Sequence, residues 1–98
     1  MCPAACTGPS TSKFALGQTV ITANAKSVLP ELDVVLAMQR HQSGDWGDVD
    51  NHDRQVNEDG LRNKGRLVSM YKSVPGQKFY IITEWNRSLT TVLLPEDY

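Results

Sequence analysis

The 98-residue sequence is short of cysteine and of long apolar runs, and each shortage excludes a class of protein. Its two cysteines are Cys2 and Cys6, so neither a multi-disulfide framework nor a four-cysteine zinc site is available. No apolar stretch approaches the roughly 20 residues that span a bilayer. The first residues do not contain a basic segment followed by an apolar one, which is the pattern of a secretory signal. The sequence therefore predicts a cytoplasmic protein.

An excess of charge of one sign is also lacking, because the net charge is −1. This balance argues against a strongly basic nucleic-acid binder and against an acidic disordered chain. The signs are nevertheless separated along the chain, with Asp45, Asp48, Asp50, Asp53, Glu58 and Asp59 followed by Arg62, Lys64, Arg66, Lys72, Lys78 and Arg87. The separation indicates two oppositely charged surfaces that orient the molecule or a dimer. The alternative is a basic face that contacts phosphate.

The length predicts one small domain, and the composition of the first residues predicts a leader before it. Residues 1–13 are rich in Pro, Gly, Ser and Thr, which favours a mobile leader. The domain then occupies residues 14–98. We expect a strand over residues 14–21 and a short helix over residues 23–29, with the Thr22 hydroxyl as the helix cap.

Two further helices are expected in the middle of the chain. The first covers residues 31–41, and the face predicted to pack on a sheet consists of Leu32, Val35, Leu36 and Gln39, with Ala37 and Met38 beside it. The second starts at a cap formed by Asp50 or Asn51 and ends near Asn63, with Gly65 as a left-handed stop. Its few apolar contacts are expected from Val56 and Leu61.

The last third of the chain predicts three strands, over residues 67–72, 78–85 and 89–94. Between the first two, Val74–Gln77 has proline and then glycine at its centre, the pattern of a type II turn. Adjacent strands joined by short turns form an antiparallel meander. The fold class is therefore α+β, with a roughly four-stranded, mainly antiparallel sheet and two to three helices on one face.

Residues 40–53 hold both histidines, a tryptophan, a serine and four aspartates, a mixture that packing alone does not require. One interpretation is a metal site with His41, Asp45, His52 and Asp53 as ligands, because imidazole and carboxylate groups bind zinc, manganese and iron. No established ligand spacing is present, and the calcium-loop pattern is incomplete. The alternative is that these side chains make local hydrogen bonds at helix ends and turns.

His41, Ser43 and Asp45 also supply the residue types of a hydrolytic triad. The glycine that a nucleophile elbow needs two residues before Ser43 is absent, which argues against this chemistry. Trp46 has two interpretations of its own. Its large apolar ring predicts a plug over the core, with His41 and Asp45 holding its loop through buried hydrogen bonds. The other interpretation is an interface with a partner.

A third interpretation is a nucleic-acid site. It would use the cations and aromatic rings along the predicted strands, namely Arg66, Tyr71, Lys72, Lys78, Tyr80 and Arg87. In such sites, bases stack on aromatic rings between cations. Strand alternation puts Tyr80 on one face of the sheet, and Phe79 and Trp85 on the other. The aromatic residues are therefore split, and most are expected in the core.

Several segments together carry a resemblance to one family. They are His41–Asp48, Asp53, Asn57, Glu58, Gly65–Tyr71, Ile81–Glu84 and Thr90–Pro95. Over about residues 15–98 the chain resembles a family of small proteins carried on plasmids, integrative elements and integron gene cassettes, often labelled plasmid-related proteins. The resemblance implies cargo of mobile DNA and a shared fold. It implies no activity, and the sequence has no methyltransferase motif that would suit the restriction–modification label of some members.

Taken together, these features favour a non-enzymatic binding or regulatory module that acts on a protein or nucleic-acid partner. The candidate binding residues are His41, Ser43, Asp45, Trp46, Asp48, Arg66, Lys72 and Arg87. The alternative is a small metal-assisted hydrolase or nuclease that uses the His41–Asp53 segment. We expect no cofactor, and we expect a homodimer formed through the exposed sheet face or through the loop that contains Trp46.

Overall fold

The computed structural model describes residues 13–73 and 76–98. The elements are β1 (Gln18–Ile21), α2 (Ala23–Val28), α3 (Glu31–Gln42), α4 (Asn51–Asn63), β2 (Leu67–Lys72), β3 (Lys78–Thr83), β4 (Leu89–Leu93) and a final 3-10 turn, η2 (Pro95–Asp97). The predicted leader lies outside the described residues except for Lys13, and so do both cysteines. The predicted turn at Val74–Gln77 falls partly outside them too.

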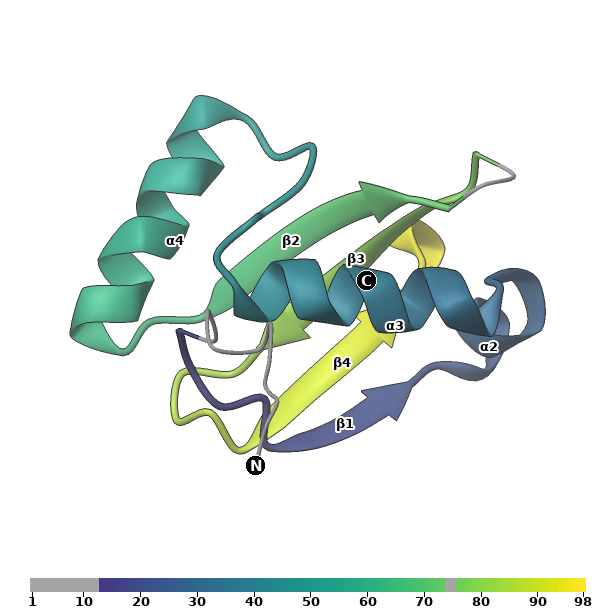
Figure 1. Ribbon diagram of the computed structural model, residues 1–98, viewed down its shortest axis with the longest axis horizontal. Coiled ribbons are helices and arrows are strands. Elements are labelled where there is room, and N and C mark those ends of the chain that lie inside the picture. The colour runs from purple at the N-terminus through teal and green to yellow at the C-terminus, as the bar shows by residue number, and fades with distance from the viewer. Residues whose placement is uncertain (1–12, 74–75) are drawn as a thin grey trace, which may run out of the picture.

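One four-stranded sheet, in the order β1-β4-β3-β2, forms the centre of the molecule (Figure 1). β2, β3 and β4 pair as an antiparallel meander, and β1 pairs with β4 in parallel. The predicted α+β class is therefore confirmed, and the first strand makes the sheet mixed. That strand is also shorter than the predicted residues 14–21, since pairing with β4 starts only at Gln18. None of the described helices has the length and apolar content of a membrane span.

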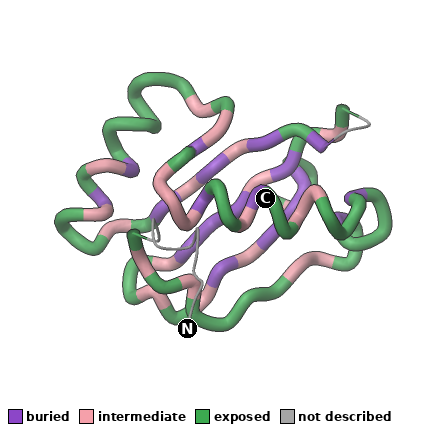
Figure 2. The backbone as a smooth tube through the Cα atoms, in the orientation of Figure 1, coloured by how far each residue is buried: buried purple, intermediate pink, exposed green. Residues whose placement is uncertain are grey.

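α3 lies across one face of the sheet, and α4 lies beside β2 (Figure 1). Buried positions alternate with less buried ones along β2 and most of β4 (Figure 2). The side chains under α3 form the apolar core together with residues of the helices: Ala25, Leu29, Ala37, Tyr71, Phe79, Ile81, Val92 and Leu94. The predicted alternation holds for Phe79, Ile81 and Thr83 of β3, which are all buried. β3 ends at Thr83, however, so Trp85, predicted on the same face, lies in the following turn and is exposed.

The orientation of α3 differs from the prediction. The face that contacts the core includes Val34, Ala37 and Met38, and the helix also buries His41. The predicted face points away from the sheet instead, with Leu32, Val35 and Leu36 exposed by 67%, 45% and 48%. The physical reason is that the sheet beneath α3 carries buried hydroxyl groups, which His41 satisfies. The small Ala37 also lets the helix approach the strands closely.

The ends and the buried face of α4 also correct the prediction. Asp50 is the N-cap, and its carboxylate accepts a hydrogen bond from the amide of Asp53. The left-handed residue at the C-terminal end is Lys64, with φ of 58°, rather than Gly65. Val56 is exposed, and the buried residues of the helix are Asn57 and Gly60. The helix therefore meets β2 mainly through a polar side chain and not through its apolar ones.

Candidate functional site

His41, the centre of the predicted site, lies fully buried in a hydrogen-bonded network. Its Nδ1 lies 2.5 Å from Ser69 Oγ, and its Nε2 lies 2.9 Å from Thr83 Oγ1. Thr83 Oγ1 is 2.8 Å from Thr90 Oγ1, which donates to the main-chain oxygen of Leu16. We call this chain of contacts the His41 network. It joins α3 to β2, β3, β4 and the segment before β1.

The His41 network fixes the protonation state of the ring. Because a carbonyl oxygen only accepts, Thr90 donates to Leu16, Thr83 donates to Thr90, and His41 Nε2–H donates to Thr83. Ser69 then donates to Nδ1, so the ring is the neutral Nε2–H tautomer. Burial, and secondarily the positive charge of Arg87, lower the pKa of His41 to about 4. Both ring nitrogens are occupied, and neither is available to a metal or a substrate.

Ser69 is a residue that the sequence reasoning did not select. Paired with His41 it supplies a hydroxyl and a base within hydrogen-bonding distance, which is the core of many nucleophilic sites. Both side chains have zero exposure, however, so no substrate reaches them in this structure. The pair stabilises the contact between α3 and β2. Its only signal in the sequence is that Ser69 occupies an inward position of an alternating strand.

The Trp46 loop, residues 43–49, covers one end of the core. Trp46 has zero exposure, and its Nε1 donates to Glu58 on α4 across 2.8 Å. Its ring stacks near Phe14, with centroids 6.3 Å apart, and meets the His41 ring edge-on at 5.7 Å. The main-chain oxygen of Asp45 accepts a hydrogen bond from the Tyr71 hydroxyl. The buried ring matches the structural plug among the two interpretations of Trp46. The hydrogen bonds predicted to hold its loop differ, because His41 bonds Ser69 and Thr83 outside the loop, and the Asp45 carboxylate accepts from Arg40 and Gly47 at the exposed surface.

The remaining residues of the predicted metal site and triad do not gather around His41. Asp45 forms an exposed ion pair with Arg40, at 2.8 Å, which holds the pKa of that carboxyl below its usual range. Ser43 donates to the main-chain oxygen of Arg40 at the end of α3. Asp48, His52 and Asp53 are exposed in or before α4. In residues 13–73 and 76–98, no group of three or more His, Cys, Asp or Glu residues is placed to hold a metal ion.

The predicted basic residues are also dispersed. Arg87 donates to the main-chain oxygens of Gly60 and Gly65, at 2.9 and 2.6 Å, so it ties the last hairpin to the end of α4. Arg66 makes a long ion pair of 3.8 Å with Glu84. Lys72 lies opposite Lys78 in the register of β2 and β3, at the far end of the hairpin. The structure therefore places Arg66 and Arg87 together near Gly65 and Glu84, and Lys72 at the opposite end of β2.

One edge of the sheet, the outer side of β2, is covered by the protein's own side chains and loop. Asn57 donates through Nδ2 to the oxygen of Val68 (2.7 Å) and accepts from its amide (3.0 Å). Two residues further along β2, the amide of Met70 donates to the main-chain oxygen of Trp46. The main-chain oxygen of Met70 accepts from the Asp48 amide. Gly47 sits between, where a Cβ would collide with the Met70 oxygen. The outward groups of Val68 and Met70 are therefore all bonded.

Replacing Asn57 with alanine tests this cover. The change removes two hydrogen bonds to the backbone of Val68, and we expect the free energy of unfolding to fall by about 1 to 3 kcal/mol. The amide of Val68 should also exchange faster with solvent. Urea denaturation and amide hydrogen exchange measure the two effects. Asn63→Ala, an exposed change in the same helix, is the control and should alter neither.

The opposite edge of the sheet, the outer side of β1, has no such cover among the described residues. The amides of Gln18 and Thr22 donate inward to Ser88 and Val92 of the β4 side. By alternation the backbone groups of Thr19 and Ile21 point outward. β1 is the last strand in the described sheet, and none of its four residues is charged or proline. Within residues 13–73 and 76–98 it is thus an unprotected edge of the kind that pairs with another strand.

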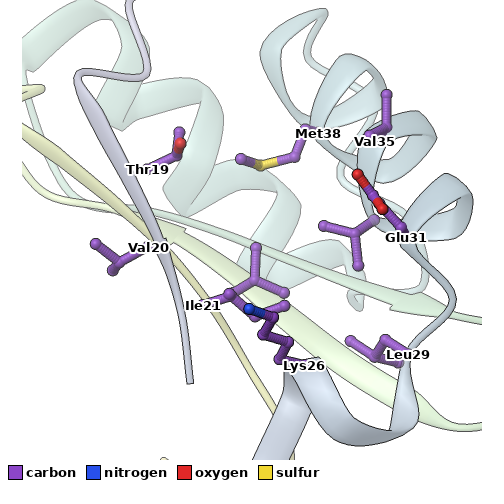
Figure 3. Close-up of a pocket in the computed structure, with 10 residues that line it drawn as sticks. Thr19, Val20, Ile21, Lys26, Leu29, Glu31, Val35 and Met38 are labelled. Atoms are coloured by element: carbon purple, nitrogen blue, oxygen red, sulfur yellow. The ribbon is translucent and has the colours of Figure 1, made fainter. Parts of the chain in front are cut away.

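An apolar groove lies directly beside this open edge, between β1 and α3 (Figure 3). Its volume is about 640 Å³, within the range of roughly 300–1,000 Å³ typical of ligand pockets. The lining residues are Thr19, Val20, Ile21, Lys26, Leu29, Glu31, Val34, Val35, Met38 and Val92. Only two of them, Lys26 and Glu31, carry charge, and the charges are opposite. We call this site the β1–α3 groove.

The groove could not be predicted from the sequence, because its walls come from segments that the sequence assigns to other roles. The periodicity of α3 predicts that Val35 packs on the sheet, and nothing in the strand that holds Thr19 and Ile21 indicates which edge it occupies. In comparisons with known proteins, no family model, curated protein or solved structure matches this chain.

Proposed function

We propose that this protein is a non-enzymatic binding module whose partner is a polypeptide. In this proposal, an extended segment of the partner pairs with the β1 edge and places apolar side chains in the β1–α3 groove. Such strand addition obtains affinity from main-chain hydrogen bonds and specificity from pockets for alternate side chains. The observation that carries the proposal is the coincidence of an apolar groove with a strand edge that no described residue covers.

The contrast between the two edges of the sheet supports this proposal. α4 and the Trp46 loop together satisfy the outward groups of Val68 and Met70 on β2. The described residues give β1 no equivalent, although it is uncharged and rich in β-branched residues. Since an exposed edge of this kind promotes unwanted pairing, a specific occupant is the simplest reason for it to persist.

The alternative functions receive less support from the described geometry. A metal-assisted hydrolase would need His41, Asp45, His52 and Asp53 to converge, whereas His41 is buried and the others lie at the surface. A nucleic-acid site would need its cations together, whereas Arg66 and Arg87 lie at one end of β2 and Lys72 at the other, and both arginines already bond protein groups. A cytoplasmic location and an origin on mobile DNA stay predictions from the sequence.

Selection of peptides from a random library on the immobilised protein tests the proposed function. We expect enriched peptides to carry apolar residues at alternating positions, because one side of an added strand faces the groove. Binding should slow the hydrogen exchange of the Thr19 and Ile21 amides, which point outward in the unbound protein. In that unbound protein, the Val68 and Met70 amides at the covered edge should already exchange slowly.

Two matched variants locate the binding. Val35→Asp places a charge in the groove wall and should abolish peptide binding. Val56→Asp makes the same change at a similarly exposed valine on α4, 48% against 45%, and should leave binding unchanged. Failure to enrich any peptide, or equal loss of binding in both variants, would contradict the proposal.

A further inference from the structure

We propose that the polypeptide occupying the β1 edge is a second copy of this chain. The two β1 strands pair antiparallel across a two-fold axis at Val20, which joins two four-stranded sheets into one continuous sheet. This inference rests on the proposed function, because it names the partner of the same edge and groove. It differs from both homodimer surfaces expected from the sequence, the exposed sheet face and the loop that contains Trp46, because it uses the edge of the sheet.

The register of this pairing follows from which backbone groups of β1 point outward. Only Thr19 and Ile21 within the strand direct their N–H and C=O groups away from β4. In an antiparallel pair, two directly opposed residues exchange both hydrogen bonds. With the two-fold axis at Val20, Thr19 of each copy lies opposite Ile21 of the other copy, so the sheet gains two such pairs. This register uses both outward residues of each copy and forms four hydrogen bonds.

The same register gives suitable side-chain neighbours on both faces of the sheet. Thr19 and Ile21 lie on the groove side, so Ile21 of the second copy would stand beside Thr19 and extend the apolar floor of the groove. Val20 also borders the groove, but its side chain points to the other face of the sheet (Figure 3) and is 37% exposed. On the two-fold axis it would meet Val20 of the second copy. An exposed apolar residue at the axis thereby becomes buried.

Charge also permits a chain to pair with itself at this edge. The residues brought opposite one another are Gln18 with Thr22, Thr19 with Ile21, and Val20 with Val20, and none of them is charged. No like-charge pair therefore opposes association, as it would at the hairpin end where Lys72 and Lys78 are opposed. The groove contributes one cation and one anion, Lys26 and Glu31, and so has no net charge to repel its own copy.

Sedimentation velocity over a dilution series tests this assembly. We expect the full-length protein to sediment as a dimer that dissociates on dilution. Val20→Lys opposes two like charges at the axis and should raise the dissociation constant on the order of tenfold or more. Thr19→Pro removes only an outward amide, so it should weaken the dimer by a similar factor while β1 stays paired with β4. Val56→Lys, at the covered edge, should leave the dimer unchanged.

Amide exchange of Thr19 and Ile21 separates failure of this inference from failure of the proposed function. In the dimer both amides should be protected, and protection should fall on dilution and in Val20→Lys. A monomeric wild type whose Thr19 and Ile21 amides become protected only with a selected peptide would overturn the dimer and keep the binding module. A dimer that survives both Val20→Lys and Thr19→Pro would overturn the pairing through β1.

Discussion

Replacing Trp46 with alanine is expected to lower the free energy of unfolding by about 3 to 5 kcal/mol. The ring has zero exposure, and it packs against Phe14 and His41, which also contact each other. Its removal leaves a cavity and also leaves Glu58 without its indole donor. Because the main chain at Trp46 covers the β2 edge, the Met70 amide should exchange faster as well. Urea denaturation and amide exchange measure these effects.

Trp85 provides the control for this experiment, because it is 61% exposed and belongs to the turn after β3. Trp85→Ala should change the free energy of unfolding by no more than about 0.5 kcal/mol, the usual range for surface substitutions. If Trp46→Ala were as mild as Trp85→Ala, the Trp46 loop would not be part of the core. Its role would then have to be reconsidered as that of a surface segment.

Acidification should destabilise the protein through His41 before most carboxylates are protonated. The pKa of His41 is about 4 in the folded protein and 6.5 in the reference state, so the unfolded chain binds the proton first. Stability is therefore complete above pH 6.5 and is lost as the pH falls towards 4. The pKa difference corresponds to a loss of about 3 kcal/mol once the pH is below both values. Denaturation in urea at a series of pH values measures it.

Two variants assign this pH dependence to one ring. His41→Gln should be less stable than the wild type at neutral pH, but the loss between pH 6.5 and 4 should shrink. His52→Gln, at an exposed histidine in α4, should keep the wild-type dependence. An unchanged pH dependence in His41→Gln would mean that another group titrates, and that the His41 network tolerates the imidazolium.

The parts of the fold that the sequence predicted are those governed by local chemistry. The three C-terminal strands follow alternation of side chains, and the Thr22 and Asp50 caps follow from short side chains that bond the first turn of a helix. Trp46 was placed correctly over the core because its ring is too large to leave in water. Each of these features is decided within a few residues of chain.

The parts that the sequence did not predict depend on distant partners. α3 is oriented by bonds from His41 to Ser69 and Thr83, 28 and 42 residues away, whereas periodicity alone selected Leu32 and Leu36. Asn57 appeared only as a match to the family pattern, yet its amide bonds a strand edge. The β1–α3 groove also depends on distant partners. It forms because Val35 faces away from the core and because β1 occupies the end of the sheet.

The parallel pairing of β1 with β4 has a consequence for the order of folding. β1 precedes every other described element, and its partner β4 is the last of the described strands. During synthesis, β1 must therefore wait for its partner until the residues of β4 have left the ribosome, whereas the β2–β3–β4 meander closes through local contacts. Until β1 has paired with β4, β4 itself is the edge strand of the sheet. The binding edge proposed for β1 therefore comes into existence only in the final step of folding.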